Sequence, residues 1–359
     1  MKYILSGGGT GGHIYPALAI ANEIKEQDPE AKILYVGKAN SLEEELAIKE
    51  GYSFAPIHIS GLPRRKINKD TVITAFNLLR GLMECGKIIK EFKPDIVIGT
   101  GGYVCAPIVL KAQQKGIKTI IQEQNAYPGK TNRILSKKAD LIALNFQEAK
   151  QYFNNDKIIF TGNPIRKDFQ DINIEKARKE LNLKKDQRLV FSFGGSGGQE
   201  STNQAILEMI QAHEKFPFHL VHVTGKNHYK KFMEQVKILP EHVKIYDYSY
   251  EVPKYLMAAD LIIASSSAMT LAEISAIGKA SILIPKSYTA GDHQVHNANS
   301  YRNILASKVI LEDYLTGEVL FDEINHLLKD DSLRHQMAEN SKKLGNDNAV
   351  KVLVKEIMK

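Results

Sequence analysis

The sequence predicts an α/β protein made of two doubly wound domains that face each other across a cleft. Three observations predict this fold. Short apolar, β-branched runs alternate with segments of helical periodicity, as in parallel sheets covered by helices. A strand, a glycine-rich turn and a helix open each half of the chain, at 2–24 and again at 188–213. The length of 359 residues also exceeds that of most single domains, so two separate cores are expected.

The first glycine turn, Gly7–Gly12, lies between a strand at Lys2–Leu5 and a helix at Ile14–Ile24. Glycines let a ligand approach the main chain closely, and the free N–H groups of a helix start favour an anion, so a phosphate-type turn is expected. His13 follows this turn directly. A helix start disfavours the cationic ring and keeps it neutral, as a general base must be. A loop-positioning role for His13 is the alternative.

The same glycines match the dinucleotide fingerprint G-x-G-x-x-G. That fingerprint requires an acidic residue near the end of the second strand, about twenty residues further on. The second strand, Lys32–Val36, ends in Gly37 and Lys38, whereas Asp28 and Glu30 come before it. A nicotinamide-dependent enzyme therefore remains only as an alternative.

Strands and helices keep alternating through the first half of the chain. Ser41 and Glu44 form a capping box at the start of the next helix, Leu42–Glu50. The elements that follow are a strand at Tyr52–Ile59, a basic stretch at Gly61–Lys66, a long helix at Asp70–Phe92, a strand at Asp95–Ile98, a second glycine turn at Gly99–Val104, a helix at Ala106–Gln114, a strand at Lys118–Gln122, a helix at Lys130–Lys137, and strands at Asp140–Leu144 and Lys157–Phe160.

Gly162 and Pro164 break the periodicity before a charged stretch, which indicates a domain boundary. We expect an N-terminal domain at 1–163, a C-terminal domain at 164–345, and a final helix at 346–359 that packs back on the N-terminal domain. The second series contains a strand at Arg188–Phe193, a third glycine turn at Gly194–Gly198, a helix at Thr202–His213, and strands at His219–Val223, Val243–Tyr246, Leu261–Ala264, Ser281–Pro285 and Lys308–Leu311.

Several polar residues of the second half fit a nucleotide-sugar site. Ser196 and its neighbouring N–H groups suit a diphosphate, although a plain turn serine is an equal alternative. Glu273 lies one turn inside a predicted helix, where its carboxylate could bridge two ribose hydroxyls or complement the helix dipole. Polar side chains at Asp292–Gln294 could contact a sugar. The sequence has no Asp-x-Asp motif and no cluster with metal-ligand spacing. Helix ends and Arg166 would therefore have to neutralise the charge of a leaving group.

The composition narrows the class of protein. Cys85 and Cys105 are the only cysteines, which excludes a disulfide framework. A leader-like start and an apolar run of spanning length are both missing, so the protein is expected in the cytoplasm. The formal charge of +7 indicates an anionic partner such as a nucleotide, a nucleic acid or anionic lipid. Lys and Arg outnumber Asp and Glu between residues 60 and 93.

A set of motifs occurs in order across nearly the whole chain and resembles the MurG family of peptidoglycan glycosyltransferases, which has the GT-B fold of two Rossmann-like domains. The motifs are Gly8–His13, Gly99–Val104, Glu123–Asn125, Gly162–Arg166, Gly194–Ser196, Ala268–Glu273 and Asp292–Gln294. The resemblance implies inverting transfer of N-acetylglucosamine from UDP-GlcNAc to the C4 hydroxyl of the muramoyl sugar of lipid I, which gives lipid II without a metal or cofactor.

The resemblance also implies roles for single residues. His13 is the candidate base. Arg166 and Ser196 would contact the diphosphate, Glu273 would contact the ribose, and Gln294 would contact the GlcNAc. The resemblance further implies that the donor sugar and the acceptor lie near Thr10, Gly11, Gly12 and Asn125. The uridine would lie against Ala268, Met269 and Thr270. The chain departs from the family at 265–267, where three serines replace an Arg and a Gly, and at Gln199, which comes one position late.

The basic stretch and the apolar helix after it match the place where this family touches the membrane. The helix carries more apolar residues than one buried stripe requires. We therefore expect docking on anionic lipid at the cytoplasmic face of the membrane, and no nucleic acid partner. The expected contacts are Leu62, Arg64, Arg65, Lys66, Phe76, Leu79 and Met83. For this segment, the alternative is a core helix with a basic rim. For the whole chain, the alternatives are another UDP-sugar transferase or a non-catalytic two-lobed nucleotide-sugar binding protein.

Overall fold

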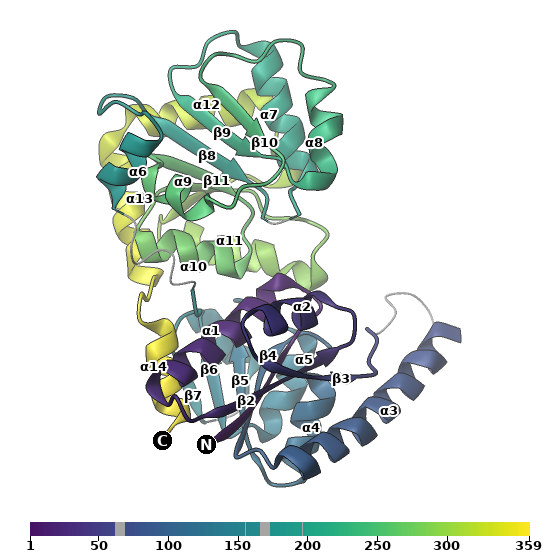
Figure 1. Cartoon of the computed structure of the whole chain (residues 1–359). Coiled ribbons are helices and arrows are strands. Elements are labelled where there is room, and N and C mark those ends of the chain that lie inside the picture. Colours follow the sequence, from purple (N-terminus) through teal and green to yellow (C-terminus); the bar gives the residue numbers. More distant parts are fainter. Residues whose placement is uncertain (62–68, 155, 166–172, 196) are drawn as a thin grey trace. The chain divides into compact units, whose positions relative to one another are not determined.

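The computed structural model describes residues 1–61, 69–154, 156–165, 173–195 and 197–359 (Figure 1). The chain divides into two compact units. Unit 1 is Met1–Ile165 together with Asn348–Lys359, and unit 2 is Arg166–Asp347. Each unit holds one parallel sheet with its own hydrophobic core, so the prediction of two doubly wound α/β domains is confirmed.

Unit 1 contains a seven-stranded sheet in the order β3-β2-β1-β4-β5-β6-β7. Its strands are β1 (Lys2–Gly7), β2 (Lys32–Lys38), β3 (Ser53–Ile57), β4 (Ile96–Gly101), β5 (Lys118–Glu123), β6 (Leu141–Leu144) and β7 (Ile158–Phe160). Its helices are α1 (Gly11–Gln27), α2 (Leu42–Lys49), α3 (Lys69–Phe92), α4 (Ala106–Gln114), α5 (Lys130–Leu135) and the C-terminal α14 (Ala349–Ile357).

Helix α14, near the C-terminus, lies beside α1, which is near the N-terminus (Figure 1). Its residues Leu353, Val354 and Ile357 are buried in the same cluster as residues of β1 and α1. Lys118 Nζ, at the start of β5, donates to the main-chain oxygen of Ile357 at 3.2 Å. The last residues of the chain therefore belong to the core of unit 1.

Unit 2 contains a six-stranded sheet in the order β10-β9-β8-β11-β12-β13. Its strands are β8 (Leu189–Phe193), β9 (His219–Val223), β10 (Val243–Tyr246), β11 (Leu261–Ala264), β12 (Ser281–Leu283) and β13 (Ser307–Val309). Its helices are α6 (Ile174–Glu180), α7 (Glu200–Ala212), α8 (Lys226–Met233), α9 (Val252–Ala258), α10 (Ala268–Ile277), α11 (His293–Asn303), α12 (Gly317–Lys329) and α13 (Asp331–Leu344).

The strand order places a topological switch point in each sheet, between β1 and β4 in unit 1 and between β8 and β11 in unit 2. At such a point the connections leave the sheet in opposite directions, so ligands bind beyond the carboxyl ends of these strands. The glycine turns Gly7–Gly12 and Gly99–Val104 begin in the last residues of β1 and β4, and Gly194–Gly198 follows β8. The switch points therefore coincide with the glycine turns.

Most element ends differ from the sequence predictions by only a few residues. The capping box at α2 is half correct. Glu44 N donates to Ser41 Oγ at 3.4 Å, but the Glu44 carboxylate accepts from Asn40 N at 2.6 Å instead of from Ser41 N. The reason is that Asn40 adopts a positive φ of 52°, which turns its N–H toward the first turn of the helix.

Candidate active site

The first two glycine turns interlock at the switch point of unit 1. A Cβ on Gly7 would lie 1.9 Å from Thr100 Oγ1, and a Cβ on Gly102 would lie 2.2 Å from the main-chain oxygen of Gly8. Gly8 N also donates to Gly101 O at 3.4 Å. The lack of side chains at Gly7 and Gly102 is therefore what lets the two turns pack against each other.

His13 is positioned by both turns. It is the third residue of α1 and is half-buried. Thr100 Oγ1 donates to the main-chain oxygen of His13 at 2.7 Å, and a Cβ on Gly101 would lie 2.8 Å from His13 Nδ1. The ring therefore packs against a bare stretch of backbone, and its Nδ1 lies 3.0 Å from Gln124 Oε1.

The loop after β5 is organised by the buried carboxylate of Glu123. It accepts from the main-chain and side-chain nitrogens of Asn125 at 2.9 and 3.1 Å, from Gly129 N at 3.1 Å and from Asn132 Nδ2 at 2.8 Å. Four donors satisfy both of its oxygens, so Glu123 acts as an anchor of the loop. It thereby fixes Asn125, one of the predicted ligand contacts, next to the residue that contacts His13.

A second buried carboxylate lies under the first glycine turn. Glu43 is only 3% exposed. A Cβ added to Gly8 would lie 2.7 Å from Glu43 Oε1, and this oxygen accepts from Lys38 N at 3.4 Å. A negative charge this close to Gly8 disfavours a phosphate directly on it. Sequence reasoning missed this charge, because Glu43 belongs to the next helix, α2.

The glycine turn of unit 2 is equally tight. A Cβ on Gly194 would lie 2.4 Å from Gln199 N, and a Cβ on Gly198 would lie 1.9 Å from the main-chain oxygen of Thr224. Gly195 and Gly198 adopt φ values of 81° and 74°, which favour glycine. Because the turn leads into the 13-residue helix α7, it aims that helix's free N–H groups beyond the sheet edge.

Glu312 joins this turn to the loop after β12. Its Oε1 accepts from Gln199 Nε2 at 2.9 Å and from Ser201 Oγ at 2.5 Å, and its Oε2 accepts from Ser287 N and Oγ at 2.7 and 2.6 Å. Burial raises the pKa of Glu312, but these hydrogen bonds outweigh burial and lower it below its usual value. Lys286 Nζ adds a second link by donating to Gly198 O at 2.8 Å.

Helices α10 and α11 carry the other predicted contacts of unit 2. Ser267 caps α10 by accepting from Thr270 N at 3.4 Å, and Ser266 Oγ donates to the main-chain oxygen of Gln294 at 2.7 Å. Ser267 thus caps α10, and Ser266 ties it to α11. Ala268, Met269 and Thr270 form the first turn of α10, and Glu273 lies on its second turn, mostly buried.

Gln294 lies at the start of α11, and its Oε1 accepts from Lys286 N at 3.1 Å. This bond orients the side-chain NH₂ group as the end that can donate to a ligand. The structure therefore brings Gln294 and the first turn of α10 to the carboxyl edge of the same sheet, beyond β11 and β12.

An aromatic corner at this edge was missed by the sequence reasoning. Tyr248 and Tyr250, after β10, pack edge to face with ring centroids 4.8 Å apart, and Lys226 Nζ lies 5.1 Å above the Tyr248 ring. Tyr250 is 86% exposed. The only signal in the sequence was two tyrosines beyond a predicted strand, which carries no ligand preference of its own.

A buried histidine supports the turn of unit 2 from below. His222 Nε2 lies 3.0 Å from Asn203 Oδ1 and its Nδ1 lies 3.0 Å from Ser192 Oγ. Asn203 Nδ2 in turn donates to Thr224 O, the atom against which Gly198 packs, at 3.0 Å. Burial lowers the pKa of His222 to about 3, because a cationic ring cannot be solvated there.

This low pKa predicts an acid-sensitive unit 2. The unfolded chain takes up a proton on this ring below about pH 6.5, whereas the folded chain does so only near pH 3. The stability that the neutral ring contributes to the folded state is therefore complete above about pH 6.5 and is lost as the pH falls. We expect about 2 kcal/mol less stability at pH 5 than at pH 8 from His222. Denaturant unfolding at both pH values should show this loss in the parent and a smaller one in His222→Gln. An equal loss in both proteins would contradict it.

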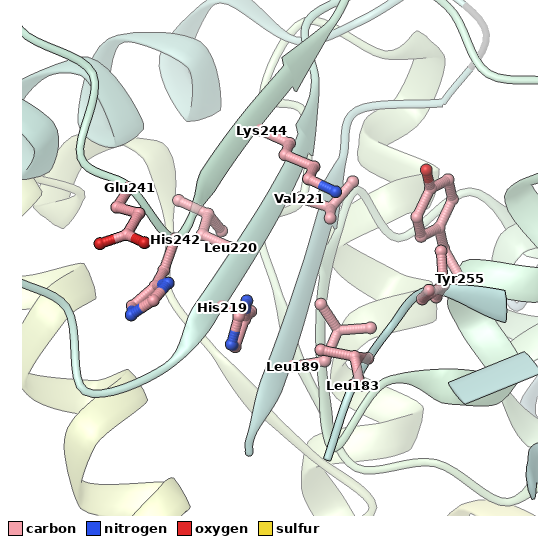
Figure 2. A pocket seen from close by; sticks show the side chains of 10 residues that line it. Leu183, Leu189, His219, Leu220, Val221, Glu241, His242, Lys244 and Tyr255 are labelled. Carbon is pink, nitrogen blue, oxygen red and sulfur yellow. The ribbon is translucent and has the colours of Figure 1, made fainter. Parts of the chain in front are cut away.

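The small cavity in Figure 2 lies at the opposite, amino-terminal edge of the unit 2 sheet. His219 and His242, whose ring centroids are 4.6 Å apart, line it together with Leu189. Its volume of about 40 Å³ holds only a few water molecules. The residues predicted for the site do not line it, so the cavity is not part of the candidate active site.

Some predicted residues lie outside the described residues, namely Leu62, Arg64, Arg65, Lys66, Arg166 and Ser196. The rest of the predicted membrane surface is described. Phe76, Leu79 and Met83 of α3 are 65%, 62% and 70% exposed. Their spacing places them on one side of the helix, so α3 carries an apolar strip that unit 1 leaves uncovered.

The comparisons with known proteins cover the whole chain. The family model of the glycosyltransferase family 28 N-terminal domain matches residues 3–144, and that of the corresponding C-terminal domain matches residues 189–356. A UDP-N-acetylglucosamine–N-acetylmuramyl-(pentapeptide) pyrophosphoryl-undecaprenol N-acetylglucosamine transferase of Finegoldia magna is 46% identical, over 99% of this chain and 97% of its own. A protein of the same name from Alkaliphilus oremlandii is 45% identical, over 99% and 98%.

Among solved structures, the crystal structure of Acinetobacter baumannii MurG matches with a TM-score of 0.80 and 25% identity. The match covers 100% of this chain and 99% of that one. The likeness therefore extends over both units.

Proposed function

Because this chain belongs to glycosyltransferase family 28, we propose that it transfers N-acetylglucosamine from UDP-GlcNAc to the C4 hydroxyl of the N-acetylmuramyl sugar of lipid I, which forms lipid II with inversion. The two relatives, which match over 97% and 98% of their length, are named for this donor and this acceptor. The resemblance seen in the sequence motifs agrees with this assignment.

The observation that carries the proposal is the different chemistry of the two switch points. In unit 2, the Gly194–Gly198 turn aims the start of α7 beyond the sheet edge, which suits the donor diphosphate. In unit 1, the buried Glu43 lies under the first turn and His13 stands beside it, which suits a hydroxyl that must lose a proton. We therefore assign donor binding to unit 2 and activation of the acceptor to unit 1.

We assign the single residues accordingly. In unit 2, Ser196 and Arg166 contact the diphosphate, Glu273 the ribose and Gln294 the GlcNAc, while the first turn of α10 lies against the uracil. In unit 1, Thr10, Gly11, Gly12 and Asn125 line the space next to His13. These assignments rest on the sequence motifs, and on their placement at the carboxyl edges of the two sheets where the structure describes them.

The reaction is a single displacement. The acceptor O4 forms a bond to C1 of GlcNAc while the bond from C1 to the diphosphate oxygen breaks, and His13 takes the proton of O4. Negative charge grows on the leaving UDP. Preorganised N–H groups at the start of α7 and Arg166 stabilise that charge, and such stabilisation is usually the largest single contribution to the rate.

The direct test is release of UDP from UDP-GlcNAc with a lipid I analogue, read out with and without EDTA. We expect release that depends on the acceptor and yields a disaccharide product, at a rate that EDTA leaves unchanged. A two-lobed binding protein would bind UDP-GlcNAc without turnover, and loss of activity in EDTA would contradict a reaction without a metal. Among the residues that the structure describes, no three metal-ligating side chains gather at one place.

We further propose that α3 docks unit 1 on anionic lipid at the cytoplasmic face of the membrane, where the acceptor is held. The exposed strip of Phe76, Leu79 and Met83 supports this, together with the cations around it in the sequence. Within the described part of the chain, no helix has both the length and the apolar character needed to cross a membrane.

Replacing Phe76, Leu79 and Met83 together by serine should weaken binding to phosphatidylglycerol vesicles at least about 10-fold, because three apolar side chains no longer enter the lipid. Co-sedimentation with vesicles measures this. The rate with a water-soluble acceptor analogue should stay the same. Ile238→Ser, at a residue of unit 2 that is 81% exposed, is the control, and equal vesicle binding by both proteins would contradict docking through α3.

A further inference from the structure

A chain of buried amide groups leads from the end of β7 to His13. Asn163 Nδ2 donates to the main-chain oxygen of Gln124 at 3.1 Å, and Gln122 Nε2 donates to Asn163 Oδ1 at 3.0 Å. Gln124 Nε2 donates in turn to Gln122 Oε1, and Gln124 Oε1 lies 3.0 Å from His13 Nδ1. The three amide side chains are between 0% and 2% exposed.

Main-chain carbonyls fix the direction of every bond in this chain. A carbonyl oxygen only accepts, so the atom of Asn163 that faces Gln124 O is the nitrogen, and its oxygen faces Gln122. Gln124 Nε2 also meets the main-chain oxygens of Thr100 at 2.6 Å and of Gln122 at 3.2 Å. A flipped Gln124 would place its oxygen against three acceptors, so Oε1 must face His13.

The ring nitrogen next to Gln124 Oε1 must therefore carry a proton. A neutral imidazole has one N–H and one lone pair, so a proton on Nδ1 leaves the lone pair on Nε2. We propose that Gln124 is a positioning residue, which holds His13 in the Nδ1-protonated tautomer so that Nε2 is the atom that takes the acceptor proton. The tautomer follows from the contact with Gln124, whereas its use in catalysis rests on the proposed function.

The neutral amide suits this task. A carboxylate at this place would stabilise the imidazolium as well as orient the ring, whereas an amide oxygen orients the ring without adding a negative charge. Burial strengthens each hydrogen bond of the chain and makes an unpaired amide costly, so the arrangement has one stable direction. Gln124 thus sets which nitrogen of His13 is basic.

Nitrogen NMR of the full-length protein labelled in its histidine rings tests the tautomer directly. His13→Ala identifies the His13 signals by their loss. We expect the parent at neutral pH to carry the proton on Nδ1. Gln124→Met, whose thioether sulfur is only a weak acceptor, should lose this preference. A parent ring with its proton on Nε2 would overturn the inference without any variant.

Kinetics then test whether the tautomer matters. Gln124→Met should lower kcat at least about 10-fold with KM for UDP-GlcNAc within about threefold, because the ring is no longer held in its active form. Gln124→Glu should restore both the tautomer and most of kcat. Its second oxygen faces three acceptors and so keeps a proton, which leaves the first oxygen to accept from His13.

Gln113→Met is the matched control. Gln113 also donates a side-chain amide to a main-chain oxygen of unit 1, that of Leu135 at 2.8 Å, and it lies outside the chain that leads to His13. Its kcat should match the parent. An unchanged tautomer or an unchanged kcat in Gln124→Met would overturn the inference. If His13→Ala is slow while Gln124→Met is not, the base role of His13 stands and the role of Gln124 falls. If His13→Ala keeps the parent rate, the base role itself is wrong.

Discussion

The His13→Ala variant should turn over UDP-GlcNAc and lipid I about 10²- to 10⁴-fold more slowly than the parent, because it lacks the group that takes the acceptor proton. KM for UDP-GlcNAc should change little, since we assign donor binding to unit 2 and His13 belongs to unit 1. Steady-state kinetics with saturating acceptor separate the two quantities.

The control for this prediction is His58→Ala. His58 is the other histidine of unit 1, and it pairs with Glu84 at 2.7 Å on the side of β3 and α3. We expect its kcat to remain within about threefold of the parent. A His13→Ala enzyme that also stays within threefold would exclude a base role for His13.

Gly198→Ala should be the most damaging single-methyl change in unit 2. The new Cβ would lie 1.9 Å from the main-chain oxygen of Thr224, and the residue would hold a φ of 74°, which alanine disfavours. Since the turn must then open, we expect a loss of about 3 kcal/mol. For a unit of this size that lowers Tm by about 6–12 °C, which calorimetry would measure. UDP affinity should fall as well, because the turn aims the N–H groups of α7.

The neighbouring glycine provides the control. A Cβ on Gly197 meets nothing within 4 Å, so Gly197→Ala should leave Tm within about 2 °C of the parent. Equal Tm values for the two variants would show that the close approach of Gly198 to Thr224 does not constrain the turn.

The sequence predicted the architecture well because local patterns decide it. The β-branched runs, the glycine turns and the breaks at Gly162 and Pro164 each act within a few residues, and the structure confirms two parallel sheets with a turn at each switch point. The family resemblance is confirmed by the family models and the relatives. His13 was identified because it follows a glycine turn directly.

The supports of the site could not be predicted in the same way, because they depend on contacts between distant segments. Glu312 holds a turn more than a hundred residues earlier in the chain, through Gln199 and Ser201. Glu43 approaches Gly8 from a different helix, and the contact between Gln124 and His13 joins the ends of two strands that are separated by β4 in the sheet. The roles of Ser196 and Arg166 stay predictions from the motifs.

A crystal structure of the protein with UDP-GlcNAc bound tests the division of work between the two units most directly. We predict the diphosphate at the start of α7, next to Gly194–Gly198, and the ribose hydroxyls at Glu273 of α10. A diphosphate seated in the Gly7–Gly12 turn of unit 1, above Glu43, would contradict the assignment of the donor to unit 2 and of acceptor activation to His13.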